Sequence, residues 1–124
     1  MNRWFLAASA LTVVTLSVHV FAGGPEIHVP IQASELSEYL RAVSAVLWHA
    51  VSVVIAGFAL AYLWAAKHDT PAMIWQMIAI QLGFAALFLW YGATLLGTIW
   101  QMPQWIIFLL IPLVSIVGLR RGSP

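Results

Sequence analysis

The chain has 124 residues, of which 63% are hydrophobic and only 7% carry a formal charge. Soluble domains carry about 25% charged residues, so this composition excludes a soluble fold. The absence of cysteine excludes disulfides, iron–sulfur clusters and thiolate metal sites, and a net charge of +1 gives no basis for nucleic-acid binding. We therefore expect one small integral membrane domain covering residues 1–124.

Acidic and basic residues are missing from three long segments, residues 4–25, 42–66 and 70–119. A helix needs about 20 apolar residues to cross a hydrocarbon core of about 30 Å, so the third segment is long enough for two crossings. The expected fold is all-α, a compact bundle of four antiparallel transmembrane helices. We place the spans at about residues 4–22, 38–66, 71–97 and 103–119, with an outer loop at 23–37.

The first span ends, on this prediction, at Gly23-Gly24-Pro25, because Gly permits a turn and Pro cannot continue the hydrogen-bond ladder. The basic start, the apolar centre and the small residue Ala22 also resemble a secretory signal. The apolar run is longer than a typical signal core, so we expect this segment to be retained. Cleavage would leave three spans.

The later spans have recognisable starts. Ser34 or Ser37 can cap the free N–H groups at the beginning of the second span. The Asp-Thr-Pro sequence at 69–71 combines capping side chains with a proline at the first helical position. Pro103 opens the fourth span in the same way.

Most basic side chains fall at one end of an antiparallel four-span chain. Lys and Arg are enriched on the cytoplasmic side of membranes, so we expect both termini to be cytoplasmic. The residues at this end are Arg3, Lys67, His68, Arg120 and Arg121.

Small and polar residues mark the faces through which helices meet in a bilayer. A second ridge of the second span, Gly57-Ala61-Ala65, has the spacing that favours close approach of a neighbour outside the bundle. The stripes predicted to face the bundle interior are Thr12, Thr15 and His19 in the first span, Ala45, Trp48, His49, Ser52, Ala56 and Ala59 in the second, and Gln76, Gly83, Trp90, Tyr91 and Thr94 in the third.

Two histidines, His19 and His49, are the ionisable residues expected at membrane depth, where such residues suggest a function. Two imidazoles on facing helices can hold a b-type haem. With Glu26 and His28 in the outer loop, the same pair can form a mixed nitrogen and oxygen site for a transition metal. Hydrogen bonding across the bundle or at a helix end explains these residues equally well.

The leading functional hypothesis is a structural or accessory subunit, packed in a homo-oligomer or beside larger subunits of a membrane complex. The alternatives are a haem- or metal-binding redox protein using His19 and His49, and a binder of lipid, quinone or pigment between Trp48, Trp90 and Tyr91. The cofactor is open on this basis, and an enzyme is not favoured because no catalytic arrangement is recognisable. A proton-coupled transporter is disfavoured because it needs a charged residue within a span, and none is expected.

Three short motifs carry a family resemblance. They are His19-Val20-Phe21-Ala22-Gly23-Gly24-Pro25-Glu26, Trp48-His49 and Pro103-Gln104-Trp105. The chain resembles small uncharacterised four-span membrane proteins of bacteria. The resemblance implies a bacterial cytoplasmic (inner) membrane location and no activity.

Overall fold

A computed structural model describes residues 1–121 of the chain, and these residues form helices and turns with no strand. A single helical rod runs from Arg3 to Gln32. It consists of α1 (Arg3–Val18), η1 (His19–His28) and α2 (Val29–Gln32). The remaining helices are α3 (Glu38–Ala65), α4 (Pro71–Leu95) and α5 (Trp105–Arg120).

The first helix does not end at Ala22 as predicted. Residues 19–28 form a π-helix, in which the N–H of Val29 bonds the Gly24 carbonyl five residues earlier. The widened turn accommodates Pro25, which has no N–H to donate and would clash in a regular α-helix. The outer connector is therefore residues 33–37, rather than the predicted loop 23–37.

The predicted starts of the later helices agree with the structure better than the predicted end of the first helix does. The Ser37 side chain accepts a hydrogen bond from the Leu40 N–H and caps α3, so Ser37 is the cap among the two serines proposed. Pro71 opens α4, although the Thr70 side chain makes no capping bond. The last helix begins at Trp105, two residues later than predicted, because 96–104 form turns that fold back on α4 and α5.

Three helices are long and apolar enough to cross a membrane, as in an integral membrane protein: Arg3–Gln32, Glu38–Ala65 and Pro71–Leu95. The fourth predicted span is shorter, because α5 has 16 residues and is about 24 Å long.

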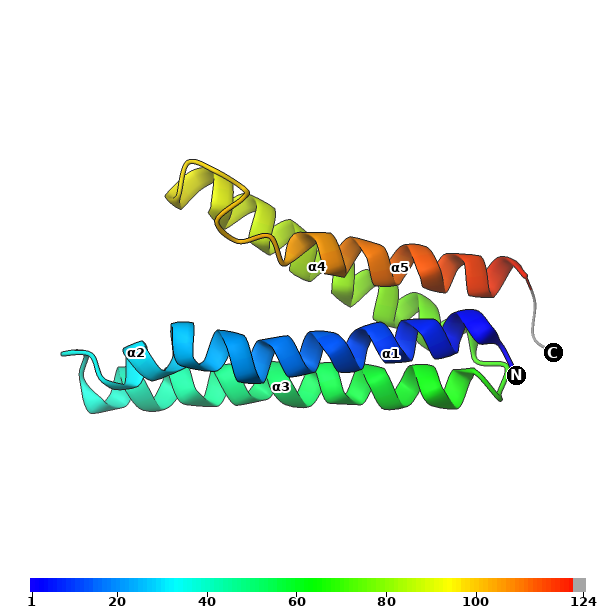
Figure 1. Cartoon of the computed structure of the whole chain (residues 1–124), viewed down its shortest axis with the longest axis horizontal. Helices are drawn as coiled ribbons and strands as arrows, with labels where there is room; N and C mark the ends of the chain where they lie inside the picture. The colour runs from blue at the N-terminus through cyan, green and yellow to red at the C-terminus, as the bar shows by residue number, and fades with distance from the viewer. Residues whose placement is uncertain (122–124) are drawn as a thin grey trace.

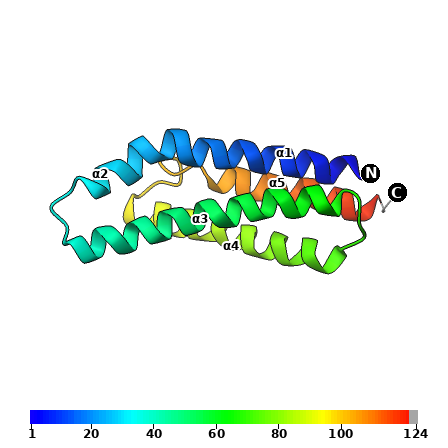
Figure 2. The same ribbon diagram turned by 90° about the horizontal axis from the view of Figure 1, so that it is seen from below.

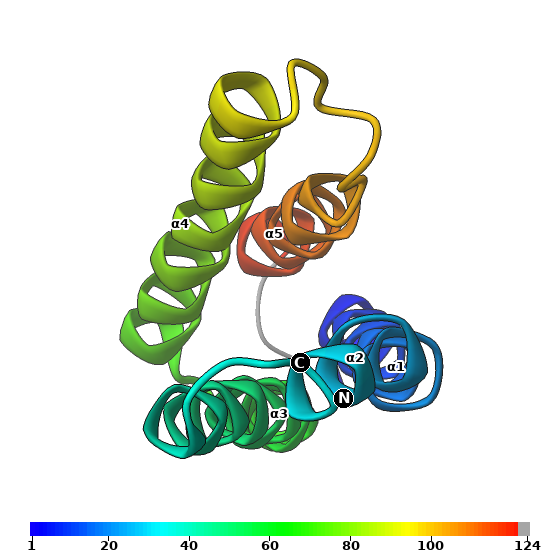
Figure 3. The ribbon, with the colours of Figure 1, turned by 90° about the vertical axis from the view of Figure 1, so that its left-hand side faces the viewer.

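The helices pack as two antiparallel pairs that converge at one end and separate at the other (Figure 1). The first rod lies along α3, and α4 lies along α5 (Figures 1 and 2). We call the end that holds the N-terminus and the turn 66–70 the closed end, and the opposite end the open end. Seen from the open end, α4 leans away from α3 (Figure 3). The predicted bundle is thus compact only in its closed half.

The hydrophobic core fills the closed end. Its buried members are Phe5, Ala8, Phe58, Tyr62, Ala65, Ala66, Ile74, Met77, Ile78 and Ile111. Asn2 ties three segments together there, because its N–H donates to the Ala66 carbonyl at 2.7 Å and its side-chain amide donates to the Gly118 carbonyl at 3.0 Å. The basic residues near both termini and in the turn 66–70 consequently share this end.

The predicted interior face of the third span is wrong. Trp90 is 65% exposed, and the other residues of that stripe are exposed as well. The face that packs inward is instead mainly apolar: Ile74, Met77, Ile78, Gln81, Ala85 and Gly92. The second ridge of α3 is covered only at one end: Ala65 is 3% exposed and belongs to the core, Ala61 packs partly against it, and Gly57 is exposed.

Candidate ligand-binding cleft

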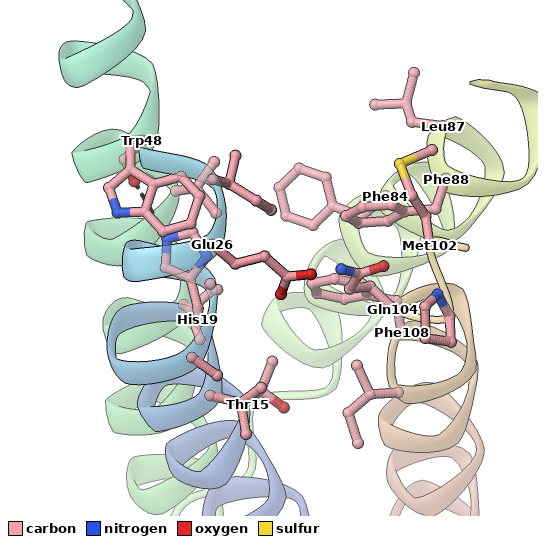
Figure 4. Close-up of a pocket in the computed structure, with 18 of the residues that line it drawn as sticks. Thr15, His19, Glu26, Trp48, Phe84, Leu87, Phe88, Met102, Gln104 and Phe108 are labelled. Carbon is pink, nitrogen blue, oxygen red and sulfur yellow. Dashed lines mark hydrogen bonds between the residues drawn. The ribbon is translucent and has the colours of Figure 1, made fainter. Parts of the chain in front are cut away.

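The separation of the two helix pairs leaves a cleft of about 960 Å³ toward the open end. Figure 4 shows its two walls, one from the first rod and α3, the other from α4, α5 and the loop before α5. The lining is mostly aliphatic and aromatic, and only a few polar side chains reach it. A cavity of this size and character is typical of a site for a small organic molecule.

The first wall depends on Trp48 and on a glycine that makes room for it. The indole of Trp48 stacks on the imidazole of His19, with ring centroids 4.1 Å apart. A Cβ atom at Gly23 would lie 3.0 Å from the tip of the Trp48 ring, so the indole can cross the helix only because this position has no side chain. Further toward the closed end the wall continues with Val14 and Ile55.

The second wall is an aromatic surface built by two helices. Phe108 of α5 contacts Phe84 of α4 edge-to-face at 5.2 Å and lies parallel to Phe88 at 6.0 Å. Met102 and Gln104 of the loop before α5 also belong to this wall (Figure 4). The indole N–H of Trp105 donates to the Ile99 carbonyl at 3.1 Å and fixes that loop onto the start of α5.

The polar groups of the cleft gather toward its open end. The carboxylate of Glu26 extends from the first wall toward the side-chain amide of Gln104 on the second (Figure 4). The carbonyl oxygen of the Gln104 side chain is buried and has no hydrogen-bond partner. The hydroxyl of Thr15 also reaches the cleft, but it donates to the Leu11 carbonyl of its own helix. The other polar side chains of the lining are His19, Ser44 and Tyr91.

A cluster of imidazole rings surrounds Trp48 beside the cleft. His28 lies parallel to the indole at 5.6 Å and meets His49 edge-to-face at 5.3 Å. His19 Nε2 lies 3.3 Å from the Trp48 carbonyl oxygen, to which it donates in the tautomer that carries the proton on Nε2. Within residues 1–121, no group of three or more His, Asp or Glu side chains is arranged to hold a metal ion.

The residues proposed from sequence as metal or haem ligands divide into two sets. His19 and Glu26 line the cleft, whereas His28 and His49 do not. The His19 ring stacks on Trp48, and the His49 ring contacts His28 edge-to-face. The geometry therefore gives no support to the haem or metal hypothesis.

Of the three aromatic residues proposed from sequence as a binding site, Trp48 and Tyr91 line the cleft, but Trp90 is exposed and does not. The second wall was not predicted, although Phe84 and Phe88 are four residues apart and so share a helix face. The position of Glu26 was not predicted either, because the helix was expected to end before this residue.

Comparisons with known proteins identify no relative. No protein-family model, no curated protein and no solved structure matches the chain. The geometry of the cleft is therefore the basis for proposing a function.

Proposed function

We propose that this chain is a membrane protein, of a bacterial cytoplasmic membrane, that binds an elongated amphiphile of the lipid, quinone or pigment class between its two helix pairs. The observation that carries this proposal is the cleft of about 960 Å³, with apolar walls and polar groups toward one end. This distribution matches a molecule with a polar head and an apolar body. The head would lie by Glu26 and Gln104, and the body would extend along Phe84 and Phe108 toward the closed end.

The surroundings of the cleft favour such a ligand over a water-soluble one. The helices that form it are apolar along nearly their whole length, so hydrocarbon would surround them. A molecule dissolved in the bilayer can reach the space between separated helices from the side, without passing through water. Burial of its apolar body against Phe88 and Ile107 adds close contacts that loosely packed lipid tails do not supply.

A variant that fills the cleft tests the proposal. Ala22 lines the cleft and is exposed, so the substitution Ala22→Phe places a ring in the binding space without entering the packed core. Ala10 lies on the same rod, is exposed and does not line the cleft, which makes Ala10→Phe the matched control. Both proteins would be purified in nanodiscs and titrated with a lipophilic fluorescent probe, and co-purifying lipids would be measured by native mass spectrometry.

We expect Ala22→Phe to weaken probe binding at least about tenfold and to lose any co-purifying amphiphile, because the ring takes the place of the ligand. Ala10→Phe should bind as the unmodified protein does. Equal binding by all three proteins, or no binding by any of them, would contradict the proposal.

An accessory-subunit function is the second candidate, and the separation of α4 from α3 favours it. A helix of a larger membrane subunit, or of a second copy of this chain, would fill the cleft between the helix pairs. Under this hypothesis the mass measured in mild detergent exceeds that of the 13.7 kDa chain, and Ala22→Phe restores the monomer. A monomer that retains a small amphiphile would reject this candidate.

A further inference from the structure

Glu26 places a carboxylate on the first rod near the open end. The rod runs to Gln32, so Glu26 lies six residues, or about 9 Å, before its end. The side chain is exposed and lines the cleft. Within residues 1–121, the Glu26 carboxylate makes no hydrogen bond or ion pair.

No basic side chain neutralises this carboxylate. The cleft lining formed by residues 14–108 contains neither Lys nor Arg. Arg41, the basic residue at the open end, is not part of the lining and donates to the Gln32 carbonyl at 3.1 Å. The remaining lysine and arginine residues lie at the closed end, and His19 is the imidazole in the lining. A carboxylate without a lysine or arginine partner attracts positive charge, so the geometry favours a ligand that brings one.

The neighbouring polar side chain does not neutralise Glu26 either. The Gln104 amide turns its nitrogen toward the Glu26 carboxylate, and its oxygen points away and is buried (Figure 4). A phosphate head group would add a second negative charge next to Glu26. A protonated amine would supply the missing positive charge.

We propose that the cleft selects cationic amphiphiles, molecules with an apolar body and a protonated amine or onium group, and that Glu26 supplies the counter-charge. This inference rests on the proposed function, because it names the class of ligand for the same cleft. The aromatic wall of Phe84, Phe88 and Phe108 would contact the apolar body, and the negative faces of such rings also attract cations.

The test compares ligands of similar shape and different charge. Tetraphenylphosphonium, neutral triphenylphosphine oxide and anionic tetraphenylborate would be titrated by calorimetry into the protein in nanodiscs of zwitterionic lipid. The variants are Glu26→Gln, which removes the charge, and Glu26→Asp, which keeps it. The matched control is Glu35→Gln, because Glu35 is an exposed acid at the same end of the molecule and does not line the cleft.

We expect the unmodified protein to prefer the cation, and Glu26→Gln to lose about tenfold in affinity for it, which corresponds to about 1.4 kcal/mol. Binding of the neutral ligand should stay unchanged, which also shows that the variant is folded. Glu26→Asp and Glu35→Gln should both keep the preference for the cation.

Two outcomes overturn the inference and can be told apart. If the neutral ligand binds as tightly as the cation, or Glu26→Gln leaves cation binding intact, the cleft binds amphiphiles without selecting charge. The proposed function then stands and this inference fails. If none of the three ligands binds, and the lipophilic probe does not bind either, both proposals fail.

Discussion

One hydrogen bond between two buried side chains connects helices that otherwise meet only near their connecting turn. The amide of Gln81 on α4 donates to the Tyr62 hydroxyl on α3 at 3.1 Å. Both side chains are buried, Tyr62 with 0% and Gln81 with 1% of its surface exposed. Because neither water nor lipid can replace a lost partner there, this bond helps to hold the two helix pairs together at the closed end.

The substitution Tyr62→Phe removes this bond and preserves the ring. We expect the free energy of unfolding to fall by about 1 kcal/mol, since interhelical hydrogen bonds in membrane proteins contribute about 0.6 and at most about 1.7 kcal/mol. Tyr39→Phe, at an exposed tyrosine, is the control and should have no measurable effect. Unfolding in mixed micelles with increasing dodecyl sulfate, followed by circular dichroism, measures both. An equal loss in the two variants would show that the bond does not contribute.

Close approach of two helices depends on a residue without a side chain in α5. A Cβ atom at Gly118 would lie 2.7 Å from the Phe5 ring and 3.2 Å from the Trp4 Cβ atom, so α5 and α1 could not keep their present separation. Gly83 in α4 is different, because a Cβ atom there would have no neighbour within 4 Å. The two glycines are thus a matched pair, one required for packing and one not.

We expect Gly118→Ala to destabilise the protein by about 1–3 kcal/mol, because the added methyl group overpacks the closed end. Gly83→Ala should be neutral or stabilising by about 0.5–1 kcal/mol, since Ala favours the helix over Gly. The same micelle titration compares them. A destabilising Gly83→Ala, or a neutral Gly118→Ala, would contradict the helix packing described here.

At the scale of the whole molecule, the positions of the charged residues provide a test of orientation. The turn 66–70 lies at the closed end with both termini, and the connector 33–37 lies at the opposite end (Figures 1 and 2). Lys67 and the arginines near the termini are expected on the cytoplasmic side. The chain has no cysteine, so an introduced thiol can be labelled without background.

Single cysteines at Leu36 and Lys67 test this orientation in intact cells. We expect a membrane-impermeant maleimide to label Leu36→Cys directly and to label Lys67→Cys only after the membrane is permeabilised. Arg3→Cys should behave like Lys67→Cys. Labelling of Arg3→Cys and Lys67→Cys from opposite sides would show that only one of the two helices between them, the first rod or α3, crosses the membrane.

The sequence predicted the helices better than their faces. In α1 the buried residue Thr12 identified the inner face correctly, because a polar residue stands out in an apolar helix. In α4 almost every residue is apolar, so hydrophobicity gives no direction, and the polar residues used as a guide lie outside. The π-helix was not predicted, because a widened helical turn and the end of a helix have the same amino-acid composition.

The cleft itself could not be predicted from the sequence. The cleft arises because the two helix pairs meet at an angle. That angle is determined by the packing of the pairs at the closed end and not by the residues that line the cleft. Glu26 shows the consequence most clearly. Its place in the cleft follows from the continuation of the helix through Pro25, and the sequence pattern suggested the opposite.

The bond from Asn2 to Gly118 has a consequence for the order of assembly. These residues are 116 positions apart, so the bond can form only after residue 118 has left the ribosome. The first two long helices can associate earlier, because Ser9 donates to the Ala59 carbonyl and needs no later segment. The structure therefore implies a sequential biogenesis. The first rod and α3 associate first, and Asn2 forms its bond to Gly118 only after α4 and α5 have been inserted.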